Sequence, residues 1–303
     1  MVDVVVIVGP TAAGKSILAQ RLAKKIDGEI ISADATQVYR LLNIGTAKVM
    51  PSERIVPHYL IDIRDPDEQY SCGDFVRDAK NLCKKIARKG KTPIIVGGTI
   101  FYIYALVNGM PEEQEIDGRI KAFVEDVSRE YGLPFIYKWL KVCDEKWAER
   151  IDKNDSYRIK RGFSFYLSRN IPYSSYLECI KRDEDFSFHL IGLSVERKKL
   201  DKMIEERVER MLKCGFVDEV EHILSLGYSA SLPSLQSIGY KEIIMFLQGK
   251  IKKEELFPRI CKATKNLAKR QMTWLRNKFH NITWLDAEAP DLVDKVVEAI
   301  SPR

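Results

Sequence analysis

The sequence predicts an α/β fold in which a parallel sheet is flanked by helices and interrupted by a mostly helical insertion. Short β-branched runs alternate with amphipathic segments in residues 1–110, which is typical of a helix-covered parallel sheet. Residues 111–186 are mostly helical in pattern and rich in charge, and an apolar strand pattern resumes after them. We therefore expect a core domain of residues 1–110 and 187–303, with residues 111–186 as an inserted helical domain.

The periodicity of the apolar residues predicts the elements in order. Continuous apolar runs bounded by turn residues indicate strands buried on both faces, and apolar residues three or four positions apart indicate helices. The expected strands are residues 4–8, 29–32, 59–63, 92–96 and 188–194. The expected helices are residues 15–26, 75–89, 198–213, 217–226, 240–247 and 254–278.

Composition excludes several classes of protein. The 303 residues are 45% hydrophobic and 30% charged, which is ordinary for a folded globular chain. No apolar run approaches the roughly 20 residues that a membrane-spanning helix needs. Six widely spaced cysteines without a C-x-x-C pair, and only four histidines, argue against a zinc site or a disulfide framework. We expect a cytoplasmic protein that is a monomer and has no membrane partner.

Charge is concentrated near the carboxyl end. The chain has a net charge of +6, but residues 250–278 hold ten Lys and Arg against two Glu. The apolar stripe of the helix expected there consists of Leu256, Ile260, Ala263, Leu267 and Trp274. The cations that fall off this stripe and are free to meet a partner are Lys262, Lys265, Lys269 and Arg276. A basic segment of this kind is either a solvated helix face or a contact surface for a polyanion.

A glycine-rich run follows the first expected strand. Gly9–Ser16 matches the phosphate-loop pattern G-x-x-x-x-G-K-[ST], with a buried strand before it and a helix after it. In such a loop the backbone N–H groups and the following helix N-terminus face phosphate oxygens. Lys15 supplies a mobile ammonium group, and Ser16 can bind Mg²⁺. The motif predicts a site for a diphosphate or triphosphate, without specifying ATP hydrolysis.

Two further loops follow strands of the same sheet. Asp34 comes after strand 29–32, and Gly97-Gly98-Thr99 follows strand 92–96. The carboxyl ends of parallel strands share one edge, so Asp34 and Thr99 should lie near the phosphate loop. No acid follows strand 92–96 to hold the magnesium of an NTPase. This favours a transferase with a diphosphate leaving group, although Asp34 taken alone is also compatible with a helix cap.

Together these motifs resemble the tRNA dimethylallyltransferase family. The segments that carry the resemblance are GPTAAGKS (9–16), DATQVYRLLNIGTAK (34–48), GGTIFYIYAL (97–106), NDSYRIKR (154–161), QSIGYKE (236–242) and TKNLAKRQMTWLR (264–276). The last two are the more specific, because a phosphate loop alone is compatible with many proteins. The resemblance implies a P-loop-kinase-like core with a mobile helical insertion. It also implies transfer of dimethylallyl from dimethylallyl diphosphate to N6 of adenosine 37 in tRNA anticodon loops.

The resemblance also implies roles for individual residues. Asp34 would be the general base and Thr99 would contact the flipped nucleotide. Mg²⁺ would be bound through Ser16. The residues implied for diphosphate binding are Gly9, Pro10, Thr11, Ala12, Ala13, Gly14, Lys15, Ser16 and Arg207. The residues implied for contact with the tRNA anticodon stem-loop are Asp34, Ala35, Thr36, Gln37, Thr99, Arg119, Tyr157, Arg158, Ile159, Lys160, Arg161, Gln236, Ser237, Ile238, Gly239, Tyr240, Lys241, Lys269, Arg270, Gln271, Met272, Thr273, Trp274, Leu275 and Arg276.

The sequence departs from the family pattern at several positions. The family often has D-S-M-Q where this chain has Asp34-Ala35-Thr36-Gln37. Arg161-Gly-Phe-Ser stands where the family has R-A-L-E, which removes a Glu and weakens the prediction of a helix there. Met203 stands where one diphosphate-side arginine is usual, which leaves Arg207 as the candidate.

Three alternatives remain open. A small-molecule kinase on the same core would need a nucleotide-base pocket and a lid, for which Arg158 and Arg161 are candidates. An adenylate isopentenyltransferase would prenylate free AMP and would not need the basic segment. A non-catalytic RNA-binding protein would not need a phosphate loop.

Overall fold

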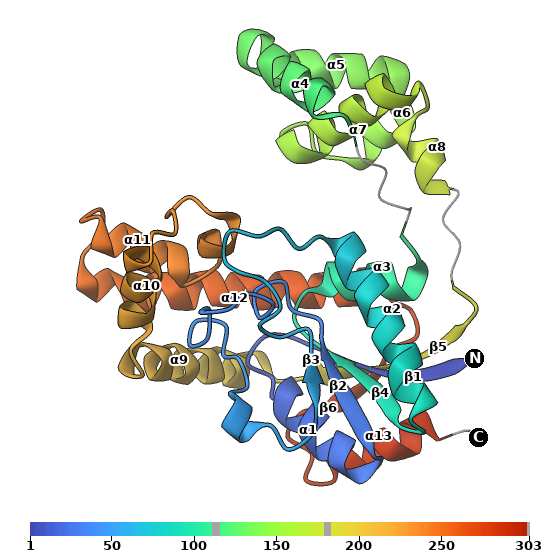
Figure 1. The fold of residues 1–303 in the computed structure, drawn as a ribbon, viewed down its shortest axis with the longest axis vertical. Coiled ribbons are helices and arrows are strands. Elements are labelled where there is room, and N and C mark those ends of the chain that lie inside the picture. The colour runs from blue at the N-terminus through green and yellow to red at the C-terminus, as the bar shows by residue number, and fades with distance from the viewer. Residues whose placement is uncertain (111–115, 179–182, 302–303) are drawn as a thin grey trace. The chain divides into compact units, whose positions relative to one another are not determined.

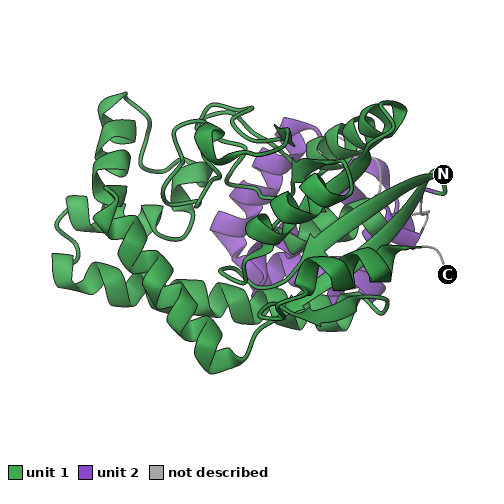
Figure 2. Ribbon diagram, turned by 90° about the horizontal axis from the view of Figure 1, so that it is seen from below, with its two compact units in different colours: residues 1–107, 184–303 green, residues 108–183 purple. Residues whose placement is uncertain are grey.

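The structure is a computed structural model that describes residues 1–110, 116–178 and 183–301. The chain forms two compact units, shown in green and purple in Figure 2. Unit 1 comprises Met1–Val107 and Glu184–Arg303, and unit 2 comprises Asn108–Asp183. The sequence placed the corresponding borders at residues 110 and 186. No helix within the described residues is both long enough and apolar enough to cross a membrane.

Unit 1 is built on a parallel sheet of six strands in the order β3-β2-β4-β1-β5-β6. The strands are β1 (Val2–Val8), β2 (Gly28–Ser32), β3 (His58–Tyr59), β4 (Thr92–Val96), β5 (Phe186–Ser194) and β6 (Thr283–Asp286). The central strand β1 pairs with both β4 and β5, with Val6 opposite Ile95 and Leu190. The expected α/β class with a parallel sheet is therefore confirmed.

Helices cover both faces of this sheet. The helices of unit 1 are α1 (Lys15–Lys25), α2 (Cys72–Arg88), α3 (Ile100–Asn108), α9 (Arg197–Lys213), α10 (Phe216–Ser225), α11 (Tyr240–Leu247), α12 (Lys253–Lys278) and α13 (Leu292–Ile300). Alternate residues of β1 point to opposite faces. Val4 and Val6 join the core under α2 and α3, whereas Val5 and Ile7 join the core under α1 and α13. Figure 1 shows these two helix pairs on opposite sides of the sheet.

The expected third strand, residues 59–63, is wrong beyond its first residue. β3 ends at Tyr59, because Leu60 and Asp62 have φ angles of 61° and 59°. Residues in this left-handed region cannot continue a β-strand.

Unit 2 is a small helical domain with its own core. It contains α4 (Gly118–Tyr131), α5 (Leu133–Cys143), α6 (Glu145–Arg150), α7 (Ser156–Arg169) and α8 (Tyr173–Glu178). Its main cluster consists of Val124, Ile136, Leu140, Ala148 and Ile159. The helix that the Arg161-Gly-Phe-Ser departure made less certain forms without interruption as α7. A Cβ at Gly162 would lie 2.6 Å from the Trp147 ring, so the glycine allows close packing.

Candidate active site

The site is a cleft of about 1090 Å³ in unit 1. Loops after β1, β2 and β4 meet there, which is the consequence of parallel strands ending at one edge. The phosphate loop, Asp34 and Thr99 line the cleft together, as the sequence suggested. Two helices complete it: α9 contributes Arg207 and α12 contributes Gln271. The cleft thus joins segments from both ends of the chain.

Lys15 occupies the phosphate loop. Its Nζ donates to the carbonyl oxygens of Gly9 at 3.1 Å and Pro10 at 2.7 Å. The pKa of Lys15 is lowered to about 7, mainly by burial and also by the nearby Arg207, while Asp34 acts in the opposite direction. A buried lysine of the phosphate loop and a nearby arginine of α9 together form an attractive site for an anion with several charges.

Asp34 and Thr99 lie together where the loops after β2 and β4 meet. Oδ1 of Asp34 accepts from the backbone N–H of Thr36 at 2.9 Å and from its Oγ1 at 2.6 Å. Oδ2 accepts no hydrogen bond from the described residues. The Thr99 hydroxyl accepts from the backbone N–H of Ala35 at 2.8 Å. No helix begins after Asp34, so the carboxylate is not a helix cap and orders a turn through Oδ1.

The helix α9 brings arginines to the phosphate side. Arg207 lines the cleft, and burial lowers its pKa while Asp34 partly offsets that effect. Arg210 also lines the cleft and was missed by the sequence reasoning. Its spacing of three residues from Arg207 on one helix face was the available signal.

The donor set fits magnesium bound together with a diphosphate. Ser16 lines the cleft and its hydroxyl makes no hydrogen bond within the described residues. Those residues contain no group of three His, Cys, Asp or Glu that could hold a metal. Mg²⁺ usually combines one or two protein oxygens with phosphate oxygens and water, and Ser16 beside the phosphate loop matches that pattern.

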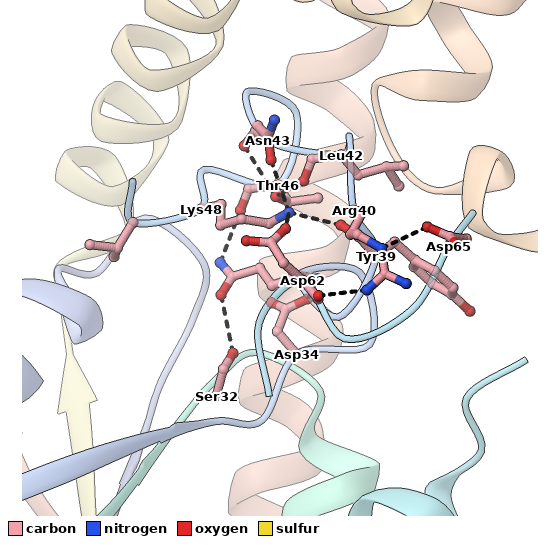
Figure 3. A network of polar contacts seen from close by, with 12 residues as sticks. Ser32, Asp34, Tyr39, Arg40, Leu42, Asn43, Thr46, Lys48, Asp62 and Asp65 are labelled. Carbon is pink, nitrogen blue, oxygen red and sulfur yellow. Dashed lines mark hydrogen bonds and ion pairs between the residues drawn. The ribbon is translucent and has the colours of Figure 1, made fainter. Parts of the chain in front are cut away.

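A buried lysine, paired with Asp62, braces the loop that carries Asp34 (Figure 3). Nζ of Lys48 donates to Asp62 Oδ1 at 2.6 Å, to Asn43 Oδ1 at 2.9 Å and to the Tyr39 carbonyl at 2.8 Å. The Lys48 side chain is 1% exposed. Gln37 is held in the same loop, because it accepts from Ser32 at 3.1 Å and donates to the Thr46 carbonyl at 3.2 Å.

Glu219 of α10 braces the same loop from the other side. Its Oε2 accepts from the backbone N–H groups of Asn43 at 3.1 Å and Ile44 at 2.7 Å. Its Oε1 accepts from the N–H of Gly45 at 3.3 Å and the hydroxyl of Tyr240 at 2.7 Å. Neither Lys48 nor Glu219 was predicted as a site residue, and no local motif marks Glu219.

The α12 residues expected to meet a partner or to contact tRNA differ in their exposure. Arg270, Gln271 and Trp274 line the cleft. Lys262, Lys269, Thr273 and Arg276 are exposed, and Met272 is partly buried. The expectation that Lys265 is free was wrong, because it forms an ion pair with Glu205 at 2.7 Å. Leu275 is fully buried, so its side chain serves the core and presents no surface to RNA.

The segment from Gln236 to Lys241 lies beside the cleft. Ser237 and Ile238 line it, and Gln236 is exposed. Gly239 has a φ of 92°, and its N–H donates to Glu242 at 2.7 Å. Lys241 is 3.7 Å from the same carboxylate. Tyr240 is fully buried against Phe216, so its side chain holds the fold and presents no surface to RNA.

The unit 2 residues expected to contact tRNA are mostly paired within that unit. Tyr157 is exposed, and Arg158 forms an ion pair with Asp155. Lys160 pairs with Glu125 at 2.6 Å, and Arg119 pairs with Asp117 at 2.8 Å. The guanidinium of Arg161 donates to the hydroxyls of Tyr173 and Tyr157. Ile159 lies in the core, and its side chain presents no surface to RNA.

Surface pairs of this kind contribute little to stability, typically ~0–1 kcal/mol each. The exposed arginines can therefore exchange an internal carboxylate for an RNA phosphate at small cost.

The fold and the cleft define a P-loop α/β protein of the kinase-like type, with a carboxylate facing the phosphate loop. Comparison with known proteins specifies the family. The IPP transferase family model matches residues 37–278, and the isopentenyl transferase family model matches residues 2–65. The chain belongs to the IPP transferase family, whose curated relatives are named tRNA dimethylallyltransferases.

Similar proteins cover nearly the whole chain. The tRNA dimethylallyltransferase of Carboxydothermus hydrogenoformans is 40% identical over 299 residues, 98% of this chain and 95% of that protein. The crystal structure of the tRNA delta(2)-isopentenylpyrophosphate transferase of Staphylococcus epidermidis is 35% identical, with a TM-score of 0.72 over 99% of both chains. A eukaryotic dimethylallyltransferase acting on tRNA is 28% identical, with a TM-score of 0.81 over 95% of this chain and 74% of the other.

Proposed function

We propose that this protein transfers a dimethylallyl group from dimethylallyl diphosphate to N6 of adenosine 37 in tRNA anticodon loops and releases diphosphate. The observation that carries the proposal is the shared cleft, in which a phosphate loop and a carboxylate lie together. The family assignment supports the same conclusion. We further propose that the protein acts in the cytoplasm as a monomer.

The donor side of the cleft suits a leaving diphosphate. As the bond between C1 of the dimethylallyl group and the diphosphate oxygen breaks, its electron pair adds charge to the diphosphate. Lys15, Arg207 and the backbone N–H groups of the phosphate loop stabilise that charge where it develops. Mg²⁺ bound through Ser16 and the diphosphate oxygens would supply additional charge stabilisation.

The acceptor side suits a poor nucleophile. The lone pair of the adenine N6 amine is delocalised into the ring, so removal of a proton as the new C–N bond forms lowers the barrier. Asp34 takes that proton, an effect worth typically ~10²–10⁴ in rate. The Thr99 hydroxyl accepts from the Ala35 N–H and so lies beside Asp34. There it positions the adenine of the flipped nucleotide. The adenine must leave its stack to reach this cleft, and exposed cations on α12 are suited to hold the surrounding RNA.

The acceptor distinguishes this proposal from the adenylate isopentenyltransferase alternative. An assay with dimethylallyl diphosphate and Mg²⁺ should offer tRNA and AMP in competition and follow prenyl transfer to each. We expect transfer to tRNA and little to AMP. Efficient transfer to AMP, with tRNA neither modified nor competing, would reverse the assignment. ATP consumption with small acceptors, and no prenyl transfer at all, would instead support the kinase.

A further inference from the structure

Gln271 makes two hydrogen bonds that join loops from opposite parts of the site. Its Oε1 accepts from the backbone N–H of Thr11 in the phosphate loop at 2.8 Å. Its Nε2 donates to the carbonyl oxygen of Gly98, next to Thr99, at 2.8 Å. We call this pair of contacts the Gln271 bridge. The bonded residues are 260 and 173 positions apart in the sequence.

From the bridge we propose that Gln271 is a positioning residue that holds the donor loop and the acceptor loop in register for transfer. The inference rests on the proposed function and adds a role that is distinct from contact with tRNA. One planar amide uses its acceptor on the donor loop and its donor on the acceptor loop. The distance between the two loops is therefore fixed by a single rigid group.

The surroundings of Gln271 keep the amide in place. Its side chain is only 5% exposed. Arg270 and Trp274 of the same helix also line the cleft. The Trp274 ring packs edge-to-face on Phe101 of α3 with 6.1 Å between ring centroids. Because α3 begins immediately after Thr99, α12 fixes the acceptor loop by packing as well as by the amide.

The backbone beside the bridge is strained in the phosphate loop and closely approached at Gly98. In the phosphate loop, Ala12 follows Thr11 with a φ of 68°. A non-glycine residue in this region is strained by roughly 1–3 kcal/mol and persists only where its neighbours hold it. On the other side, a Cβ at Gly98 would lie 3.0 Å from Gln271 Nε2 and 3.7 Å from Asp34 Oδ2. Gly98 therefore leaves room for the amide beside the proposed base.

A variant of similar size tests the bridge. Gln271→Met keeps the volume and removes both hydrogen bonds, whereas Gln271→Glu keeps the acceptor for Thr11 and cannot donate to Gly98. The control is Asn266→Ala, which removes an exposed amide from the same helix that makes no side-chain hydrogen bond within the described residues. Thermal unfolding of each variant should be followed first, so that only folded protein enters the comparison.

We expect Gln271→Met to lower the single-turnover rate of dimethylallyl transfer by roughly 10–100-fold, the scale on which small misplacements of reacting groups act. Binding of dimethylallyl diphosphate and of tRNA, measured separately, should stay within about threefold of wild type. Gln271→Glu should be as slow or slower. Asn266→Ala should match wild type. A wild-type rate in folded Gln271→Met would overturn the proposal, as would a loss confined to tRNA affinity.

A second variant approaches the bridge from its other end. Gly98→Ala should slow transfer when Gln271 is present, because the new methyl group displaces the amide. In the Gln271→Met background the same change should cost much less, so the two effects should be non-additive. Fully additive effects would show that the two residues act independently and would contradict the bridge. If wild type and Asn266→Ala also transfer nothing, the proposed function fails, and this outcome is distinct from failure of the bridge.

Discussion

The carboxylate of Glu219 is predicted to determine the stability of the loop that carries Asp34. In Glu219→Gln, one carboxylate oxygen becomes an amide NH₂ that cannot accept a hydrogen bond. The least costly arrangement turns the NH₂ toward Tyr240, whose hydroxyl can accept, and leaves the Gly45 N–H without its partner. The variant loses the hydrogen bond to the Gly45 N–H, and its other hydrogen bonds no longer involve a charged carboxylate. Together these losses should lower the free energy of unfolding by about 2 kcal/mol.

This loss is measurable by thermal unfolding. For a domain of this size, ~2–4 °C in Tm corresponds to 1 kcal/mol, so Glu219→Gln should unfold about 6 °C below wild type. Glu221→Gln is the matched control, because Glu221 is exposed on the same helix. The transfer rate should fall together with Tm, because residues 43–48 belong to the same loop as Asp34 and Glu219 holds that loop in place. A Tm for Glu219→Gln equal to that of Glu221→Gln would refute the reasoning.

Three further predictions concern the donor, the base and the RNA. Lys15 has a pKa of about 7 when free, and bound diphosphate favours its charged form. Binding of dimethylallyl diphosphate should therefore take up a proton at pH 8 but not at pH 6, and its affinity should fall as pH rises above about 7. Calorimetry of this binding in two buffers, with Lys15→Met as control, measures the proton uptake. Asp34→Asn keeps the Oδ1 contacts and should lower the single-turnover rate by roughly 10²-fold while both substrates bind; a rate within a few-fold of wild type would place the base elsewhere. Arg158→Ala should reduce the slope of log affinity for tRNA against log salt by about one, and an unchanged slope, equal to that of Arg129→Ala, would remove Arg158 from the RNA contact.

The regular elements were predictable because burial imposes a period on the sequence. Residues 92–96 and 240–247 were predicted to the residue. Some elements were missed, including α13, whose apolar residues do recur at helical spacing. Two others lack such a period. α3 is apolar on nearly all sides, and β6 has a mostly exposed pattern at the edge of the sheet. β3 was overextended because no sequence pattern indicates the left-handed φ angles of Leu60 and Asp62.

The site was predictable where its chemistry is local. The phosphate loop is contiguous, and Asp34 and Thr99 follow strands whose ends must converge. The Gln271 and Glu219 contacts depend instead on residues more than 170 positions apart. Such pairs follow from packing, and no periodicity or motif carries them. The family resemblance indicated the segment around Gln271, while its role as a bridge required the geometry.

The central claim is that this cleft transfers a dimethylallyl group to one adenosine of tRNA. Its most direct test is mass analysis of nucleosides and mapped fragments from a tRNA pool incubated with the protein, dimethylallyl diphosphate and Mg²⁺. The account predicts a mass gain of one dimethylallyl unit on a single adenosine, located at position 37 of the anticodon loop, and no gain with Asp34→Asn at matched short times. Unmodified tRNA, or the same gain spread over many adenosines, would contradict it.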